Sequence, residues 1–337
     1  MLTSVFNLAE ASFLAASNLT MRPVQNMFEA LSKPAESINV LAWLTIGICF
    51  VIFIIVGGLL TWVLIRYHRT PVGKGKEPPQ IYGSVQIELA WTVIPIIIVF
   101  TLILVTARTI AEIQDAKMPE DAIKVRLVGR QWWWEVHYPD LGIETATDIH
   151  VPLSTPENRR VTHILLESAD VVHSFWIAQL AGKTDVFPNH PNETWIEPTA
   201  EGVFFGNCAE YCGTQHANML LRVIVEPEEE FQKWVANQKA PPVDDPAVAA
   251  GKQLFFDTAC INCHTIGDSI AKGNFGPDLT HLMSRQTIGS GVAPLNYETL
   301  LRWVRDPQDM KIGCLMPNMQ LNEEQVTQIT DYLYTLK

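Results

Sequence analysis

Two long apolar segments are the strongest constraint on how this chain can fold. Residues 41–65 and 89–107 contain no charged side chain, and each segment is long enough to cross about 30 Å of hydrocarbon as a helix. The alternative for each segment is a helix buried in a soluble core. We predict that the chain is a multidomain membrane protein and that these segments form a two-helix transmembrane hairpin.

The connection between the apolar segments indicates how the hairpin is oriented. It holds Arg66, Arg69, Lys74 and Lys76 against the single acid Glu77. Basic connections stay on the cytoplasmic side, so both termini are expected outside. The formal net charge of the whole chain is -12, and most of that charge then belongs to the external part. This acidity favours a basic partner protein and argues against binding to nucleic acid.

After the second apolar segment the pattern changes to short stretches in which apolar and polar residues alternate. Pro, Gly, Asn and Asp turns separate these stretches, and this density of period-two segments is typical of an all-β sandwich. The predicted strands are 123–128, 161–167, 194–197, 202–205 and 220–225.

A second change follows a stretch rich in Pro and acidic residues at 239–246, which we interpret as a linker. Beyond it, apolar residues recur at spacings of three and four in 247–257, 297–306 and 322–336. The last part of the chain is therefore predicted to be a small all-α domain. Its core is modest, so a covalently attached cofactor would help to hold it together.

One loop between predicted strands carries the residues of a metal site. It contains Cys208, Cys212, His216 and Met219, and a further candidate ligand, His173, lies upstream. Thiolate and thioether sulfur favour Cu(I), while imidazole tolerates both oxidation states, so this set fits copper that cycles by one electron. A disulfide between Cys208 and Cys212 is the structural alternative.

The segment C-I-N-C-H at residues 260–264 is the attachment pattern of a c-type haem. The thiols of Cys260 and Cys263 can add to the two vinyl groups of one porphyrin, and His264 then reaches the iron. A zinc knuckle or a redox dithiol is the alternative, but neither explains the histidine together with a downstream methionine.

The sixth iron ligand is expected to be a methionine, because a thioether stabilises Fe(II). Met316 is our prediction and Met319 is the second candidate. We expect Met310 and Met283 to be packing residues. His281 would give a bis-histidine haem, which is the less favoured arrangement.

With these residues in hand, the chain resembles subunit II of the haem-copper cytochrome c oxidases, and more closely the caa3-type form with a fused cytochrome c domain. The resemblance runs from about residue 38 to the end, includes the stretch D-V-V-H-S-F-W around His173, and is most specific in the copper loop. It implies a cupredoxin-like sandwich and a class I cytochrome c domain. The implied division is an external N-terminal arm (1–36), the transmembrane hairpin (37–110), the CuA domain (111–236), a linker (237–246) and the cytochrome c domain (247–337).

In that family the loop carries the binuclear copper centre CuA. The second cysteine also argues against a mononuclear blue copper site, which needs only one. The ligands that the resemblance implies are the thiolates of Cys208 and Cys212, the imidazoles of His173 and His216, the thioether of Met219 and the backbone carbonyl of Glu210.

The resemblance also implies three further roles, one of them for the side chain of Glu210. Trp132 opens the run Q-W-W-W, which is similar to the aromatic patch where electrons enter the family's copper domain; Trp133 stands where the family often has tyrosine. The Glu210 carboxylate would help to bind magnesium at the junction with subunit I. Glu88 would lie at the mouth of a proton-conducting channel of subunit I. Aromatic core packing and a solvated helix end are the ordinary alternatives.

The predicted protein is the electron-input subunit of a proton-pumping terminal oxidase in the bacterial inner (plasma) membrane. Electrons would pass from haem c through CuA to haem a of subunit I, where oxygen is reduced. The predicted partners are subunit I, subunit III, membrane lipid, and a cytochrome c or a quinol-oxidising membrane complex as donor. Two alternatives remain: a membrane-anchored copper and haem electron-transfer module outside any oxidase, and a nitrous oxide reductase, which would need a further histidine-rich domain.

Overall fold

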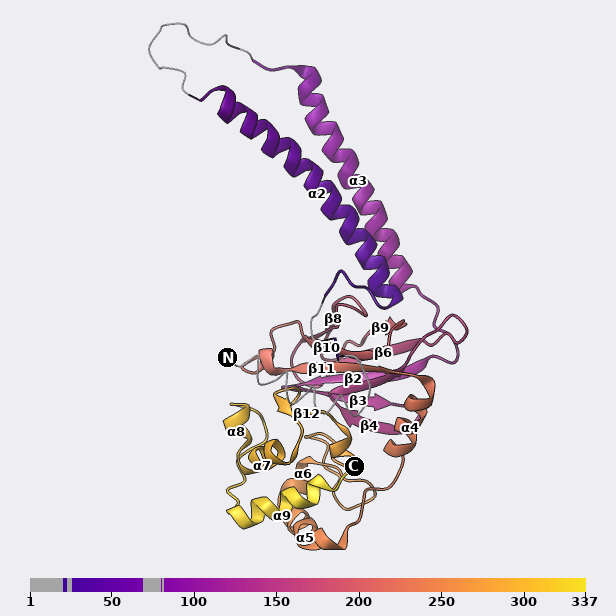
Figure 1. Ribbon diagram of the computed structural model, residues 1–337, viewed down its shortest axis with the longest axis vertical. Coiled ribbons are helices and arrows are strands. Elements are labelled where there is room, and N and C mark those ends of the chain that lie inside the picture. The colour runs from indigo at the N-terminus through magenta and orange to yellow at the C-terminus, as the bar shows by residue number, and fades with distance from the viewer. Residues whose placement is uncertain (1–20, 23–25, 69–79, 81) are drawn as a thin grey trace. The chain divides into compact units, whose positions relative to one another are not determined.

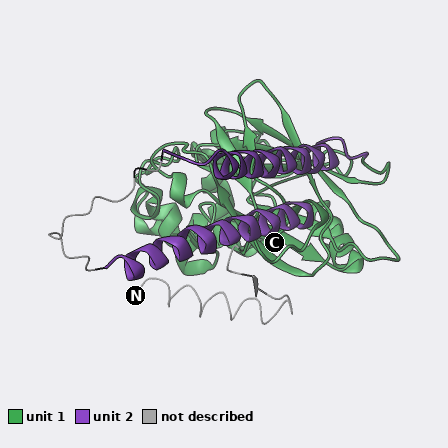
Figure 2. Cartoon of the chain, turned by 90° about the horizontal axis from the view of Figure 1, so that it is seen from above, with its two compact units in different colours: residues 1–35, 118–337 green, residues 36–117 purple. Residues whose placement is uncertain are grey.

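The structure of the chain is a computed structural model that describes residues 21–22, 26–68, 80 and 82–337 (Figure 1). By their contacts the residues form two compact units (Figure 2). Of the described residues, those from 36 to 117 form one unit, and those before residue 36 form the other together with 118–337.

The smaller unit is a pair of long helices, α2 (Lys33–Arg66) and α3 (Val85–Gln114). Both are long and apolar enough to cross a membrane. Their apolar side chains are largely exposed, as a surface that faces lipid requires. The two predicted spans are confirmed as helices. Of the basic residues between them, Arg66 ends α2, whereas Arg69, Lys74 and Lys76 lie outside the described residues.

The larger unit begins with a β-sandwich. One sheet has five strands in the order β4-β3-β2-β6-β9, and the other has the order β5-β11-β10-β7-β8 with β1 paired to β10. The predicted strands are confirmed as β2, β6, β9, β10 and β11, while the other six were not predicted. The bounds are β1 (Met21–Arg22), β2 (Ile123–Arg130), β3 (Trp133–Tyr138), β4 (Ile143–Ala146), β5 (Asp148–Pro152), β6 (Thr162–Ser168), β7 (His173–Trp176), β8 (Thr184–Val186), β9 (Asn192–Ile196), β10 (Gly202–Cys208) and β11 (Leu220–Glu226).

Alternation of side chains builds the core of this sandwich. In β6, Ile164 and Leu166 are fully buried while the intervening residues are only half-buried. They belong to one buried cluster with residues of the other sheet, such as Phe204. Helix α4 (Glu228–Gln238), which was not predicted, adds Phe231 and Val235 to the same cluster.

The described part of the N-terminal arm lies along the sandwich. Strand β1 runs parallel to β10. Further along, the amide of Leu31 donates to the carbonyl of Gln179 at 2.9 Å, and the carbonyl of Leu31 accepts from the amide of Thr199 at 2.9 Å. Residues of the arm therefore complete backbone hydrogen bonds of the sandwich.

The C-terminal part of the larger unit is helical and has its own buried cluster, which includes Phe255, Leu300, Ile329 and Tyr332. The three predicted helices are confirmed as α5, α7 and α9. Both α7 and α9 begin at an asparagine capping box, which satisfies the free amides of the first turn. The helix bounds are α5 (Ala249–Asp257), α6 (Cys260–Cys263), α7 (Tyr297–Arg305), α8 (Pro307–Met310) and α9 (Glu323–Tyr334), with short 3₁₀ turns at Pro246–Val248 and Leu282–Ser284 and a strand pair β12 (Thr287–Ile288) and β13 (Ala293–Pro294).

A buried ion pair connects the sandwich to the helical part. Arg222 of β11 and Asp148 of β5 lie 3.0 Å apart, with both side chains almost inaccessible. Arg222 also donates to Gln286 Oε1 at 2.9 Å and to Thr287 Oγ1 at 3.2 Å. Removing one partner of such a pair leaves the other charge buried and uncompensated.

Replacement of Arg222 by methionine should destabilise the larger unit strongly. Loss of one partner of a buried pair costs about 3–5 kcal/mol, which corresponds to a fall of roughly 10 °C in the unfolding midpoint of a unit of this size. Tryptophan fluorescence of the intact protein during heating measures the midpoint. Arg126→Met is the matched control, because the Arg126 side chain is 41% exposed in its pair with Glu167. Equal midpoints for the two variants would contradict the expectation.

Candidate metal and haem sites

The copper loop closes on itself at its two ends. Strand β10 ends at Cys208, and β11 starts one residue after Met219. The amide of Cys208 donates to the carbonyl of Met219 at 2.9 Å. The first and last predicted ligands of the loop are therefore neighbours at the ends of adjacent antiparallel strands, and no metal is needed to bring them together.

All the predicted ligands of the loop lie around the two cysteine sulfur atoms. Cys212 Sγ lies 3.7 Å from Cys208 Sγ, 3.6 Å from His216 Nδ1 and 3.8 Å from Met219 Sδ. The Glu210 carbonyl oxygen lies 3.1 Å from Cys208 Sγ. The cysteines are free thiols, and 3.7 Å is far longer than a disulfide bond of about 2.05 Å. The structure therefore contains no disulfide between Cys208 and Cys212.

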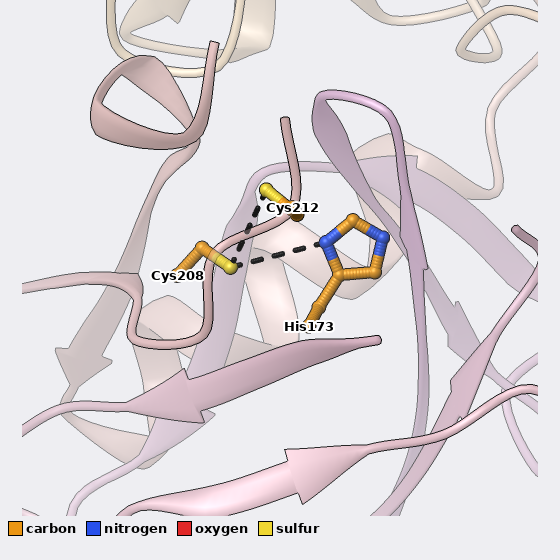
Figure 3. A group of neighbouring side chains, drawn as sticks. All are labelled: His173, Cys208 and Cys212. Carbon is orange, nitrogen blue, oxygen red and sulfur yellow. Dashed lines mark hydrogen bonds between the residues drawn. The ribbon is translucent and has the colours of Figure 1, made fainter. Parts of the chain in front are cut away.

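His173 comes to the same place from β7, which pairs with β10. Its Nδ1 lies 3.8 Å from Cys208 Sγ, and Figure 3 shows the ring pointing at the two sulfur atoms. The ring passes close to the backbone of Gly129, where a Cβ would lie 2.7 Å from His173 Cδ2. Glycine at position 129 therefore makes room for the imidazole.

Asp170, which the sequence reasoning missed, orients this histidine. Its Oδ1 lies 2.7 Å from His173 Nε2, so Nδ1 is left to face the sulfur atoms. Asp170 also accepts hydrogen bonds from the amides of Gln131 and Val171 at 2.6 and 2.7 Å. Although burial acts to raise the pKa of Asp170, the hydrogen bonds lower it below its ordinary value. The only sequence signal was an acid three residues before the histidine.

The two sulfur atoms are electrostatically unequal. The hydrogen bond with Cys212 lowers the pKa of Cys208 to about 3, and the hydrogen bond with His173 contributes in the same direction. The Cys208 thiolate in turn raises the pKa of Cys212. A bound metal cation would stabilise both sulfur atoms as thiolates, because metal coordination deprotonates thiols. The donor set of two thiolates, two imidazoles and a thioether therefore fits copper.

Trp132 is joined directly to the copper loop. Its indole Nε1 donates to the Cys212 carbonyl at 2.9 Å, and Gln131 Nε2 donates to the same oxygen at 2.8 Å. Of the other two residues with an implied further role, Glu210 is half-buried and Glu88 is exposed in the first turn of α3. Their proposed roles stay predictions.

The haem attachment segment lines a cavity of about 320 Å³. Helix α6 holds Cys260 and Cys263 one turn apart, and His264 follows directly. The cavity is largely apolar, and both Met316 and Met319 line it. Because both methionines line the cavity, the structure does not show which of them is the sixth iron ligand.

His264 is held with one ring nitrogen available to iron. Its Nδ1 lies 2.8 Å from the carbonyl oxygen of Pro277, which fixes the tautomer and leaves Nε2 free. Burial lowers the pKa of His264, so the imidazole is neutral, as a ligand must be. A Cβ on Gly276 would lie 2.6 Å from His264 Cε1, so glycine permits the close packing. These residues fit a covalently attached haem.

The remaining candidates for iron ligation take other positions. His281 lies 2.9 Å from the Lys337 carbonyl through Nδ1 and 3.1 Å from the Ala240 carbonyl through Nε2, so both ring nitrogens are in use. Met283 and Met310 pack against the buried cluster of the helical part, as predicted. Cys314, whose role the sequence did not explain, also lines the haem cavity.

Glu135, His137 and Glu144 form a second group whose ligand atoms lie close together. Glu135 Oε1 lies 2.8 Å from His137 Nε2, and Arg130 Nε donates to Glu135 Oε2 at 2.5 Å. Burial acts to raise the pKa of Glu135, but these partners lower it. An ion-pair network accounts for this group without a metal.

The fold and the two sites define a class: a membrane-anchored electron-transfer protein in which a copper-type β-sandwich is joined to a c-type cytochrome domain. Three family models match the chain. They are cytochrome c oxidase subunit II, transmembrane domain, at residues 21–108; cytochrome c oxidase subunit II, periplasmic domain, at residues 142–226; and cytochrome c at residues 248–337.

Similar proteins extend over most of the chain. Cytochrome c oxidase subunit 2 of Alkalihalophilus pseudofirmus is 32% identical over 87% of this chain and 85% of its own length. The subunit 2 of Bacillus sp. (strain PS3) is 36% identical over 80% of each chain. A solved structure, the periplasmic domain of subunit II from Bradyrhizobium japonicum, is 29% identical over 36% of this chain and 97% of that chain, with a TM-score of 0.34.

The chain belongs to the cytochrome c oxidase subunit 2 family. It is thus a subunit of a terminal oxidase, with an electron-input role and other oxidase subunits as partners, which confirms the predicted family, fold class and function. Family membership also implies CuA copper and haem c. Because the chain belongs to an oxidase family, the two alternatives, an isolated electron-transfer module and a nitrous oxide reductase, are rejected.

Replacement of Asp170 by asparagine should weaken copper binding without removing haem. Loss of a partner that orients a metal-ligating histidine typically costs about 10–100-fold in affinity. Copper retained after dialysis against a graded chelator series measures the effect. Glu193→Gln is the matched control, because Glu193 pairs with the surface residue His163 at 2.9 Å. Copper retention equal to that of the control would show that Asp170 does not orient a ligand.

Proposed function

We propose that this chain accepts electrons at haem c and delivers them through CuA to haem a of subunit I, where oxygen reduction is coupled to proton pumping. One observation carries this proposal: the wall of the haem cavity includes Trp132 and Trp133, and Trp132 is hydrogen-bonded to the Cys212 carbonyl of the copper loop. When bound, haem c and the copper pair would each take up and release single electrons.

The chain's own residues would hold and orient both groups. The proposed copper ligands come from a loop between two paired strands and from a third strand, so their spacing is set by backbone hydrogen bonds rather than by the metal. Little reorganisation is then needed when the charge of the site changes. The proposed ligands are His173, Cys208, Glu210, Cys212, His216 and Met219 for copper, and Cys260, Cys263, His264 and Met316 for haem.

The haem site offers its iron ligand a largely apolar environment. His264 is half-buried, and mainly apolar residues line the cavity that it faces. Low polarity around a haem disfavours the more highly charged oxidised form and so raises the reduction potential, as does a methionine ligand. These residues favour the uptake of an electron from an external donor.

Finer parts of the proposal rest on the family resemblance. Trp132 would be the point where electrons enter the copper domain, Glu88 would lie at the mouth of a proton channel of subunit I, and the Glu210 carboxylate would bind magnesium at the subunit junction. We place both cofactor domains and both termini on the periplasmic side of the inner membrane. The other proposed partners are subunit III and an electron donor, which is a cytochrome c or a quinol-oxidising complex. The proposed domains keep the bounds 1–36, 37–110, 111–236, 237–246 and 247–337.

Metal analysis and electron paramagnetic resonance of the purified, fully loaded protein test the cofactor assignment. We expect two coppers per haem iron, and a hyperfine pattern of an electron shared between two copper nuclei. Met219→Leu should change the copper signal and leave the haem spectrum intact. A single-copper pattern in the unmodified protein, or loss of haem in the variant, would refute the assignment.

The choice between Met316 and Met319 as iron ligand needs its own experiment. Met316→Ala should lower the reduction potential of the haem and abolish the sulfur-to-iron charge-transfer band, because the thioether stabilises Fe(II). Met319→Ala is the matched control, since both residues line the same cavity. If only Met319→Ala produces this result, Met319 is the ligand.

A further inference from the structure

The helical part and the sandwich are hydrogen-bonded to each other beside the copper loop. The Leu220 amide donates to the Ser290 carbonyl at 3.1 Å, and Ser290 Oγ donates to the Leu220 carbonyl at 2.7 Å. Gln215 Nε2 donates to the Ile312 carbonyl at 2.6 Å. Both sandwich residues, Gln215 and Leu220, directly flank the proposed ligands His216 and Met219, so the junction lies directly against the copper loop.

Lys311 lies at the centre of this junction. Its ammonium group donates to three main-chain carbonyls: Trp132 at 2.7 Å, Asn218 at 2.8 Å and Gly289 at 2.6 Å. The first two belong to the sandwich and the third to the helical part. Only 3% of Lys311 is exposed to solvent.

Burial of this cation is costly. Loss of hydration lowers the pKa of Lys311 to about 7, and neighbouring Cys314 and Cys212 act in the opposite direction. Three carbonyl oxygens need three N–H groups, however, and only the protonated amine has three. Charge-assisted hydrogen bonds are roughly twice as strong as neutral ones, so the three acceptors offset part of the cost of desolvation.

The acceptors of Lys311 connect it to both cofactor sites. The Trp132 indole is bonded to the Cys212 carbonyl, and Asn218 directly precedes Met219. On the other side, Lys311 begins the loop that carries Met316, and Lys311 itself lines the haem cavity with Trp132. The Lys311 side chain therefore links the haem-cavity loop to the copper loop, in addition to the hydrogen bonds of Leu220 and Gln215.

We propose that Lys311 is a positioning residue that holds the haem cavity at one fixed distance from the copper loop, so that electrons pass between the two sites without movement of a tethered domain. This inference rests on the proposed electron route and specifies how the chain sets its geometry. A displacement of about 1 Å at a reacting pair can cost a hundredfold in rate, and electron transfer likewise depends steeply on separation.

The linker is consistent with a fixed arrangement. Gln238 Nε2 donates to Ser284 Oγ at 3.0 Å, and the Ala240 carbonyl lies 3.1 Å from His281 Nε2. The first part of the linker is thus bonded to the helical part. The buried pair of Arg222 and Asp148 adds further hydrogen bonds at the other side of the junction.

The test compares Lys311→Met, Lys311→Arg and the unmodified chain within the assembled oxidase. A photochemical one-electron reductant reduces haem c in a flash, and the copper absorbance then reports transfer between the two sites. Rates are taken only from molecules that retain both cofactor spectra. Lys311→Met should slow the transfer by at least about tenfold, and Lys311→Arg, which keeps charge and donors, should recover part of the rate. Lys272→Met is the control, since Lys272 Nζ donates to the Gly267 carbonyl at an exposed site.

Hydrogen exchange gives a second measurement that needs no bound cofactor. In Lys311→Met the Leu220 amide, which donates across the junction, should exchange at least about tenfold faster, whereas Lys272→Met should leave it unchanged. Unchanged transfer and exchange in Lys311→Met would overturn the inference, as would equal transfer rates for the methionine and arginine variants. Absence of transfer in the unmodified chain would instead refute the proposed electron route.

Discussion

The hydrogen bond from the Cys208 amide to the Met219 carbonyl is the constraint on which the copper site depends. It brings the two ends of the ligand loop onto paired strands, and the sulfur atoms of Cys208 and Cys212 then lie 3.7 Å apart without a metal. The folded sandwich, with its large buried core, holds these two sulfur atoms close together. Metal binding can therefore use a geometry that folding has already set.

Much of this arrangement could be predicted from sequence because the signals are local. Uncharged segments of membrane length, alternation in β6 and the Cys-X-X-Cys-His spacing each depend on neighbouring residues. Ligand chemistry alone was enough to name His173 as a candidate partner of a loop 35 residues later, whereas the family resemblance was needed to assign the backbone carbonyl of Glu210. The strand pairing of β7 with β10 then supplied the physical reason for that combination.

Other features could not be predicted because they depend on contacts between distant parts of the chain. Asp170 is an ordinary acid until the fold places it against His173. Nothing in the local sequence distinguishes Lys311 from an exposed lysine, because its burial depends on the sandwich, which supplies the carbonyls of Trp132 and Asn218. Helix α4 was not predicted because its first turn is charged, and because the burial of Phe231 depends on contacts with the sandwich.

The buried Arg222–Asp148 pair, with its hydrogen bonds to Gln286 and Thr287, has an evolutionary consequence. A cytochrome domain joined to a copper domain by gene fusion would begin as an independent appendage. Here the surface between them is buried, so a substitution of Arg222 or Asp148 also disturbs Gln286 and Thr287, and substitutions on one side should be accompanied by compensating substitutions on the other.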